Sequence, residues 1–351
     1  MKKIVLTGGG TAGHVTPHFA LLPHLQQEGW EIHYIGTYEG IERSLVGDQL
    51  PYYPISAGKL RRYFDLKNFS DPFRVIKGVF DAHRILRKLR PQVVFSKGGF
   101  VTVPVTVAAW SLGIPVVLHE SDLTPGLANR LSLPFAAQLC LTFPDSLEHV
   151  KGKGVVTGTP IRPELTQGSK EQGLSLCQFS SNSPTLLVMG GSLGSALLNQ
   201  TIRENLSTLT EHYQIIHLCG KGNLDSEISN IRYHQLEYAQ EELPDLLAAA
   251  DFVISRAGAN SIFELVALAK PNILVPLSRQ ASRGDQILNA QSFARQGFSL
   301  VIQEEDLTIG QLLKELTFLS TNRTKFVDAM QASQIGDGTQ NVLKVIREAA
   351  R

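Results

Sequence analysis

The chain has 351 residues, of which 43% are hydrophobic and 19% are charged, and its net charge at pH 7 is +1. This length and composition predict two globular domains and exclude a disordered chain, while the near-neutral charge gives no general affinity for nucleic acid. The three cysteines lack the spacing of a metal or redox motif, which is typical of a reducing compartment. The chain begins without a signal-peptide pattern, and its apolar runs fall short of the roughly 20 residues of a membrane-spanning helix, so we expect a soluble or membrane-surface protein.

The first half of the chain alternates between short apolar runs and helical patterns. We predict strands at residues 3–7, 31–35, 93–96, 115–118 and 154–157. We predict helices between them at about 15–28, at 72–89 and in a segment that ends near 112. Glycine-rich or polar segments follow three of the strands, at 8–14, 97–100 and 119–122. Because open parallel sheets bind ligands at the carboxyl ends of their strands, we expect these segments to line a binding site.

A basic block covers residues 59–90, where ten Lys or Arg residues outnumber three Asp or Glu residues. The helix within it carries a stripe with the spacing of a core-facing side, formed by Val75, Val79, Ala82, Leu86 and Leu89. Beside this stripe lies a second apolar set with flanking cations, made of Phe73, Ile76, Phe80, Lys77 and Arg84. Either the helix is buried on two sides, or the second set is an exposed patch that seats the protein on an anionic membrane.

Residues 163–183 contain several Gly, Ser and Asn residues and predict a linker, after which the pattern starts again. We predict strands at 185–189, 215–218, 252–255, 272–275 and 299–302. We predict helices at 196–206, at 243–250, after the turn at 256–258, and from about 339 onward. Asn260 and Ser261 are expected to cap the helix after the turn, and Pro271 to end it. The glycine loop at 190–195 and the turn at 256–258 both precede a helix, where free backbone N–H groups are typical of phosphate sites.

Both halves begin with a strand, a glycine-rich loop and a helix, and both continue in strand–helix alternation. This repetition predicts an α/β protein with two doubly wound, Rossmann-like parallel-sheet domains and a ligand cleft between them. We place the first domain at residues 1–161 with the C-terminal helix at 337–351, and the second domain at residues 162–336.

The motifs GGGTAGHVTP, SKGGFVTVP and HESDLTPGLANR in the first half, with GGSLGS and SRAGANSIFE in the second, make the chain resemble the MurG family of peptidoglycan glycosyltransferases. The resemblance implies a GT-B fold and an inverting transfer of N-acetylglucosamine from UDP-N-acetylglucosamine to the muramoyl 4-hydroxyl of undecaprenyl-diphospho-muramoylpentapeptide, which turns lipid I into lipid II. It also implies that the reaction needs no metal and no cofactor, and that the protein works peripherally at the cytoplasmic face of the bacterial cell membrane. Protein partners from the cell-wall and division machinery are a further implication.

The resemblance assigns the second domain to the donor and the first to the acceptor and the membrane. The donor residues that it implies are Thr11, Ala12, Gly13, Asp122, Arg162, Ser192, Ala259, Glu264, Asp285 and Gln286. Within this set, Ser192 would meet the UDP phosphates, Arg162 would balance the leaving diphosphate, and Glu264 would bind the ribose. Asp122 and Asp285 stand where the family commonly has Asn and Gln. Two glycine pairs would cradle the acceptor diphosphate, namely Gly9, Gly10, Gly98 and Gly99.

Two residues compete for the role of the base that deprotonates the attacking hydroxyl. His14 matches the family's candidate base, and its place at a helix N-terminus disfavours the imidazolium and keeps the base form available. Glu120 is the alternative, because it lies at the end of a strand near the other polar segments. His14 could instead only bind the acceptor diphosphate.

Three other functions stay open at this point. An NAD(P)-dependent oxidoreductase would use the G-x-G-x-x-G spacing of Gly8, Gly10 and Gly13, although that motif alone is a weak signal. A GT-B glycosyltransferase with another lipid or aglycone acceptor would share the same fold. A non-catalytic protein that binds sugar nucleotides would keep the donor site without turnover.

Overall fold

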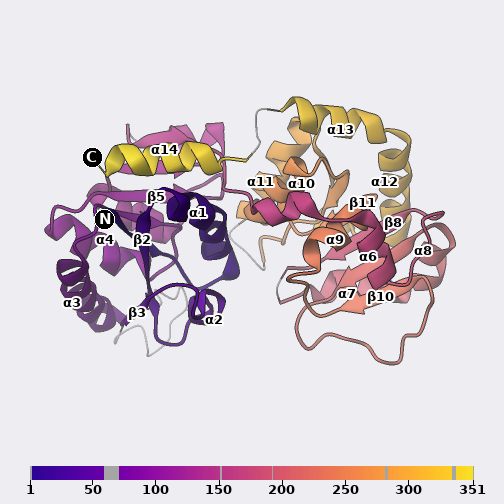
Figure 1. Ribbon diagram of the computed structural model, residues 1–351. Helices are drawn as coiled ribbons and strands as arrows, with labels where there is room; N and C mark the ends of the chain where they lie inside the picture. The colour runs from indigo at the N-terminus through magenta and orange to yellow at the C-terminus, as the bar shows by residue number, and fades with distance from the viewer. Residues whose placement is uncertain are drawn as a thin grey trace. The chain divides into compact units, whose positions relative to one another are not determined.

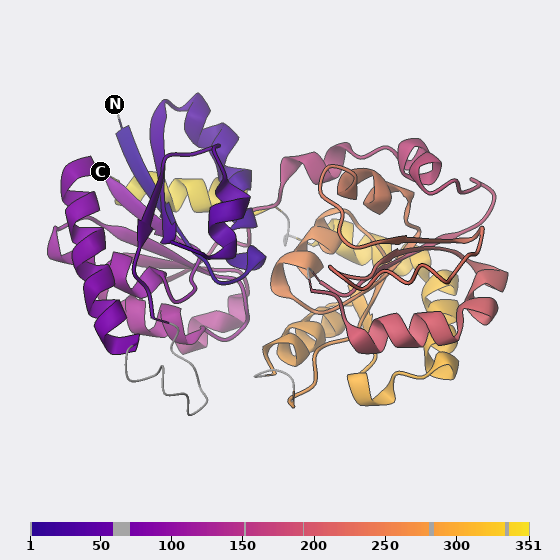
Figure 2. The same cartoon turned by 90° about the horizontal axis from the view of Figure 1, so that it is seen from below.

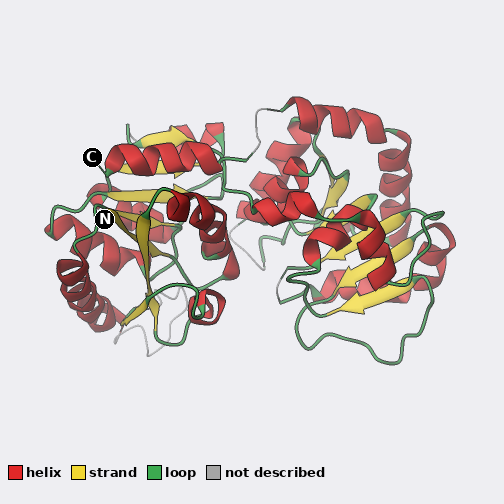
Figure 3. Ribbon diagram, in the orientation of Figure 1, coloured by secondary structure: helices red, strands yellow, loops and turns green. Residues whose placement is uncertain are grey.

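The computed structural model describes residues 2–58, 71–150, 152–191, 193–280, 284–333 and 337–350. The chain divides into two compact units, one formed by Met1–Ile161 with Asp337–Arg351 and the other by Arg162–Gly336. In each unit, helices cover both sides of a parallel sheet (Figures 1 and 3). The predicted pair of doubly wound α/β sheets is thereby confirmed. The basic loop at 59–63 and the candidate Ser192 lie outside the described residues.

The sheet of the first unit has the strand order β3-β2-β1-β4-β5-β6-β7 within the described residues, and every pair is parallel. Its strands are β1 (Lys2–Thr7), β2 (Trp30–Thr37), β3 (Tyr52–Ile55), β4 (Val93–Ser96), β5 (Val116–Glu120), β6 (Gln138–Leu141) and β7 (Gly154–Val156). β4 and β5 are buried along their whole length, which explains why each begins with three consecutive apolar residues. The sequence did not predict β3 or β6.

The helices of the first unit bury one apolar core on each side of this sheet. They are α1 (Thr16–Gln27), α2 (Ile41–Val46), α3 (Asp71–Leu89), α4 (Thr102–Ser111), α5 (Leu127–Ser132) and α14 (Thr339–Ala349). α14 returns from the end of the chain to pack on this sheet, where Val342 and Ile346 share a core with Leu21 of α1 (Figures 1 and 2). On the other side, Ala82 and Leu86 of α3 are fully buried.

The second unit has the strand order β10-β9-β8-β11-β12-β13 within the residues described, again all parallel. Its strands are β8 (Thr185–Met189), β9 (Gln214–Leu218), β10 (Tyr233–Leu236), β11 (Phe252–Ser255), β12 (Asn272–Leu274) and β13 (Ser299–Val301). Its α-helices are α6 (Lys170–Leu176), α7 (Ala196–Glu204), α8 (Leu206–His212), α9 (Leu243–Ala249), α10 (Ala259–Ala267), α11 (Asp285–Arg295), α12 (Ile309–Thr321) and α13 (Arg323–Ala332).

Two local predictions in this unit are wrong. The expected linker at 163–183 contains α6, whose Leu174 is buried in the core beside Leu246 of α9. Asn260 and Ser261 do not cap α10, because the helix already begins at Ala259 with Gly258 at the capping position and no side-chain cap. The local signal for α6 was present, because Ser169 caps the helix by accepting the N–H of Gln172, and Lys170, Glu171 and Gln172 favour a helix.

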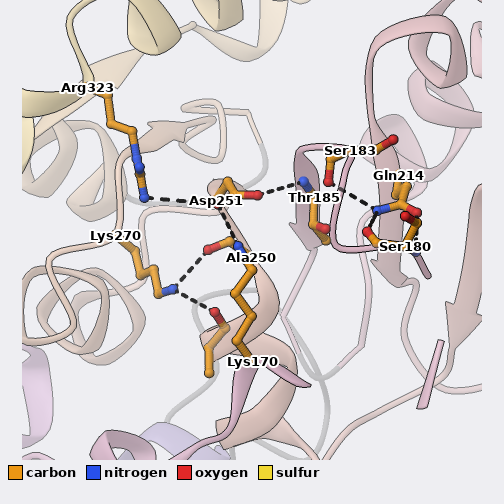
Figure 4. Close-up of polar contacts among 10 residues, drawn as sticks. Lys170, Ser180, Ser183, Thr185, Gln214, Ala250, Asp251, Lys270 and Arg323 are labelled. Carbon is orange, nitrogen blue, oxygen red and sulfur yellow. Dashed lines mark hydrogen bonds and ion pairs between the residues drawn. The ribbon is translucent and has the colours of Figure 1, made fainter. Parts of the chain in front are cut away.

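Asp251 ties helices to the amino ends of two neighbouring strands (Figure 4). Its carboxylate accepts the backbone N–H of Thr185 at 3.0 Å and the ammonium of Lys170 at 3.1 Å, and the guanidinium of Arg323 lies 4.0 Å away. Lys270 donates to the Ala250 carbonyl at 2.8 Å beside it. These contacts hold α6 and α13 against the sheet at the edge opposite the glycine loops.

Candidate active site

Each sheet changes its direction of strand addition at one point, and the predicted glycine-rich segments lie there. In the first unit the change falls between β1 and β4, so the loops at 8–14 and 97–100 lie next to each other. In the second unit it falls between β8 and β11, so the loop at 190–195 neighbours the turn at 256–258. Crevices at such switch points are where open α/β sheets bind their ligands.

His14 is held in one orientation by the loop that carries it. It ends a short 3-10 turn, Ala12–His14, just before α1, and its Nδ1 lies 3.1 Å from the Gly9 carbonyl oxygen and 3.1 Å from Thr11 Oγ1. A carbonyl oxygen only accepts hydrogen bonds, so a hydrogen bond to Gly9 requires the hydrogen on Nδ1 and leaves the lone pair of the neutral ring on Nε2. This tautomer is the one that a general base needs.

The glycines of the two loops allow close backbone contact, and several of their N–H groups are used within the protein. Gly9 donates to the Gly98 carbonyl at 3.3 Å, Gly10 to the Glu42 carboxylate at 3.2 Å, and Gly98 to Ser96 Oγ at 3.1 Å. A Cβ at Gly99 would lie 2.1 Å from the Gly9 carbonyl oxygen. The structure thus brings the four predicted glycines together. Three of their N–H groups, however, donate hydrogen bonds to other groups of the protein.

The Glu120 side chain accepts hydrogen bonds from the segment that follows β5. Its side chain is buried, and its carboxylate accepts N–H groups from Asp122 at 3.1 Å, Gly126 at 2.8 Å and Asn129 at 2.9 Å. Burial raises the pKa of Glu120, with the charge of Asp122 as a further cause. These contacts fix the backbone of Asp122 and indicate a structural role for Glu120, which favours His14 as the base.

Lys97 is a buried cation that the sequence did not single out. Its side chain is 1% exposed and donates to His119 Nδ1 at 2.9 Å and to Ser121 Oγ at 2.7 Å. Burial lowers the pKa of Lys97 to about 7, although the Glu120 carboxylate opposes this shift. The sequence did carry a signal for Lys97, because this lysine lies directly between the end of β4 and the glycines at 98 and 99.

Arg162 and Glu264 form an ion pair in the second unit. Arg162 Nε and Nη2 both lie 3.0 Å from Oε1 of Glu264, and each side chain is 18% exposed. Burial raises the pKa of Glu264, while the Arg162 guanidinium opposes the rise. Both N–H contacts of Arg162 go to the same oxygen, so the guanidinium holds the Glu264 carboxylate through Oε1.

The remaining donor candidates lie at the starts of two helices. Ala259 is the first residue of α10, and Asp285 and Gln286 open α11 directly after Gly284. Gln286 Oε1 accepts the backbone N–H of Leu277 at 3.0 Å, so this side chain also holds the segment after β12. Thr11, Ala12, Gly13 and Asp122 belong to the first unit.

Arg256 connects the strand ends of the second unit and was also missed. Its side chain is buried and donates to the Val275 carbonyl at 3.1 Å, to Ser195 Oγ at 2.6 Å and to Glu304 at 2.5 Å. Ser195 in turn accepts the N–H of Leu198 in the first turn of α7. Arg256 therefore orients the glycine loop relative to the ends of β11 and β12.

The second apolar set on α3 is exposed, so the interpretation of a helix buried on two sides is wrong. Phe73, Ile76 and Phe80 are 75%, 54% and 71% exposed, and Lys77 and Arg84 are exposed beside them. Trp110 on the adjacent helix α4 is also 58% exposed. Among the helices described, none is long and apolar enough to cross a membrane.

Comparisons with known proteins match both units. Residues 4–140 match the N-terminal domain of glycosyltransferase family 28, and residues 185–346 match its C-terminal domain. A UDP-N-acetylglucosamine–N-acetylmuramyl-(pentapeptide) pyrophosphoryl-undecaprenol N-acetylglucosamine transferase of Clostridium botulinum is 56% identical, and the alignment covers 99% of each chain. A transferase of the same name from Clostridium perfringens is 57% identical over 99% of this chain and 98% of the relative.

A solved structure gives the same picture of the fold. The crystal structure of Acinetobacter baumannii MurG superposes with a TM-score of 0.75 at 27% identity, covering 99% of this chain and all of that one. A glycosyltransferase of kitacinnamycin has a TM-score of 0.76 at only 13% identity, with 99% of this chain and 98% of that chain covered, and thus supports the GT-B fold alone.

Proposed function

The chain belongs to glycosyltransferase family 28, and we propose that it transfers N-acetylglucosamine from UDP-N-acetylglucosamine to the muramoyl 4-hydroxyl of undecaprenyl-diphospho-muramoylpentapeptide. The observation that carries this function is the 56% identity, over nearly the whole of both chains, to a transferase of that name. The glycine-rich segments at the switch points of the two sheets also support it. The reaction would turn lipid I into lipid II in peptidoglycan synthesis.

The mechanism that we propose is a single displacement with inversion. The 4-hydroxyl oxygen attacks the anomeric carbon of the donor sugar, and the bond from that carbon to the β-phosphate oxygen breaks, with its electron pair leaving on UDP. Nε2 of His14 takes the hydroxyl proton, which agrees with the tautomer set by the Gly9 carbonyl. Arg162 and the helix N-termini of the second unit would stabilise the leaving diphosphate.

On the donor side, Glu264 would bind the ribose hydroxyls through Oε2, because Oε1 receives both N–H groups of Arg162. Ala259 would approach the uracil or ribose at the start of α10, and Gln286 with Asp285 would contact the sugar from the start of α11. Ser192, Thr11, Ala12, Gly13 and Asp122 would complete the donor site. Gly9, Gly10, Gly98 and Gly99 would lie against the acceptor diphosphate.

We place the protein on the cytoplasmic face of the membrane through the exposed patch on α3. Three large apolar side chains in contact with water, with cations beside them, are typical of a surface that binds anionic lipid. The acceptor's undecaprenyl chain lies in the same membrane, so this patch would also bring the first unit to its substrate.

Phe80→Asp is expected to weaken binding to anionic vesicles by about 10-fold, because it places a carboxylate in the apolar patch. Raising the salt concentration should weaken binding of the unchanged protein as well, since screening reduces the attraction of Lys77 and Arg84 to lipid phosphates. Sedimentation with phosphatidylglycerol vesicles measures both effects. Phe318→Asp is the matched control, because Phe318 is 48% exposed on α12 of the other unit. An equal loss of vesicle binding in both variants would show that the patch on α3 is not the binding surface.

Transfer of label from radioactive UDP-N-acetylglucosamine to a lipid I analogue, with EDTA present, tests the proposed function. We expect label in the lipid product. Transfer to a diacylglycerol or another aglycone but not to the lipid I analogue would assign the chain to a GT-B enzyme of different specificity. Binding of the donor without any turnover would indicate a protein that only binds sugar nucleotides.

A further inference from the structure

Glu42 is a fully buried carboxylate beneath the loop that carries His14, and the mechanism above does not use it. It is the second residue of α2, and its side chain is 0% exposed. Oε1 accepts the backbone N–H of Thr37 at 3.0 Å and the Thr37 hydroxyl, and Oε2 accepts the N–H of Gly10 at 3.2 Å. The end of β2 thus holds the carboxylate in place, and the carboxylate holds the glycine loop.

Three glycines make room for this side chain. A Cβ at Gly9 would lie 2.6 Å from Cδ of Glu42, a Cβ at Gly40 would lie 2.1 Å from Oε1, and a Cβ at Gly36 would lie 2.9 Å from Cγ. Gly9 lies in the loop after β1, Gly40 in the turn before α2, and Gly36 at the end of β2. The backbone therefore surrounds Glu42 closely, and a glycine at each position is required for that approach.

One peptide group connects Glu42 to His14. The N–H of Gly10 and the C=O of Gly9 belong to the same trans peptide and point in opposite directions. Glu42 accepts the N–H end, while the C=O end accepts Nδ1–H of His14 at 3.1 Å. A negative charge at the N–H end strengthens the carbonyl as an acceptor, because hydrogen bonds in series polarise one another.

We propose that Glu42 is a positioning residue for His14, which it orients and makes more basic through the Gly9–Gly10 peptide. This inference rests on the proposed function, in which His14 is the base. In hydrolase triads a carboxylate contacts the histidine directly and fixes its tautomer. Here the same effect passes through a peptide group, which keeps the carboxylate away from the anionic substrates.

Several other titratable groups face these two side chains and bear on the pH dependence. Tyr34, Tyr52 and Arg43 lie near Glu42, and burial raises the pKa of both tyrosines. On the side of His14, burial lowers the pKa of His18 on α1 to about 3 and that of Lys97 after β4 to about 7. Behind Lys97 lie His119 and Glu120 of β5, with Asp122 in the following loop. Glu42→Gln leaves Lys97 and the other groups in place, so the comparison between the variant and the unchanged protein isolates the charge of Glu42.

The first experiment is Glu42→Gln in the full chain, assayed for transfer to the lipid I analogue from about pH 5.5 to pH 9. The variant keeps the shape of the side chain and removes its charge. We expect kcat to fall about 10-fold and KM for UDP-N-acetylglucosamine to stay within about 2-fold, because only the base is weakened. The acid limb of the pH–rate profile should move to lower pH, since loss of a nearby negative charge disfavours the imidazolium. An unchanged kcat and acid limb would overturn the proposal.

Asp81→Asn is the matched control, because Asp81 also accepts a backbone N–H in this unit, that of Ser56 at 3.1 Å, on an element away from the glycine loop. It should leave the acid limb in place. A shift equal to that of Glu42→Gln would contradict the specific role.

The second experiment needs no turnover and therefore separates this inference from the proposed function. Nitrogen-15 NMR of histidine-labelled protein, with the His14 signal assigned by its loss in His14→Ala, reports the tautomer directly. We expect hydrogen on Nδ1 in the unchanged protein and a larger share of the other tautomer in Glu42→Gln. Hydrogen on Nε2 in the unchanged protein would overturn the proposal even if transfer is observed. Absence of transfer in the unchanged protein, with the expected tautomer present, would contradict the proposed function and leave the Glu42 contact standing.

Discussion

His14→Ala is expected to lower kcat about 1,000-fold while KM for UDP-N-acetylglucosamine stays within about 2-fold, because the loss of a general base acts on the transition state and hardly on donor binding. The geometry supports this outcome, since Nδ1 of His14 is committed to the Gly9 carbonyl and the basic lone pair lies on Nε2. Steady-state transfer to the lipid I analogue measures both constants. A fall of less than about 10-fold would leave His14 only a binding role.

Two variants make the test of His14 specific. His24→Ala removes another histidine from the same region, on α1, and should leave kcat unchanged. Glu120→Gln should lower thermal stability, because the carboxylate accepts three N–H groups and an amide cannot accept all of them without placing its own N–H₂ group against a donor. If Glu120→Gln instead abolishes turnover without loss of stability, Glu120 rather than His14 is the base.

Glu264→Ala is expected to raise KM for UDP-N-acetylglucosamine about 100-fold, because it removes the proposed acceptor of the ribose hydroxyls and leaves Arg162 without its partner. The same measurement with the 2′-deoxyribose analogue of the donor separates the two causes. The unchanged protein should prefer the ribose donor, whereas the variant should hardly distinguish the two donors. A variant that still prefers ribose would contradict the proposed contact.

Arg162→Lys shows how far the ion pair contributes, because lysine keeps the charge but lacks the fork that places two N–H groups on one carboxylate oxygen. We expect a smaller rise in KM than for Glu264→Ala. Glu28→Ala is the matched control, since it breaks a more exposed ion pair with Arg347 in the other unit. It should leave KM unchanged.

Much of the fold followed from patterns within short stretches of sequence. The buried strands β1, β4 and β11 are apolar runs that end in glycine or polar residues, and such runs are recognisable without knowledge of their neighbours. The glycine loops after β1 and β8 were predicted for the same reason. The family motifs then located the candidate site residues along the chain.

The predictions that failed depend on what surrounds a segment. The Gly, Ser and Asn residues at 163–183 suggest a linker, but the segment contains the capped helix α6, whose Leu174 packs in the core with α9. Two apolar sets on α3 look similar in sequence, and only the packing of the helix decides that Ala82 is buried while Phe80 is exposed. Periodicity identifies apolar sides, but it does not state which of them another element covers.

The sequence by itself determined the α/β class, the strand–glycine–helix units and the family, because each depends on residue types at short, regular spacing. Only the tertiary structure decided which partners the polar groups have. Glu42 meets Gly10 from 32 positions away, and Arg162 meets Glu264 from 102 positions away. The first pair forms where the parallel strands β1 and β2 bring their carboxyl ends to one edge of a sheet, so its geometry depends on strand order and register, which no local pattern encodes.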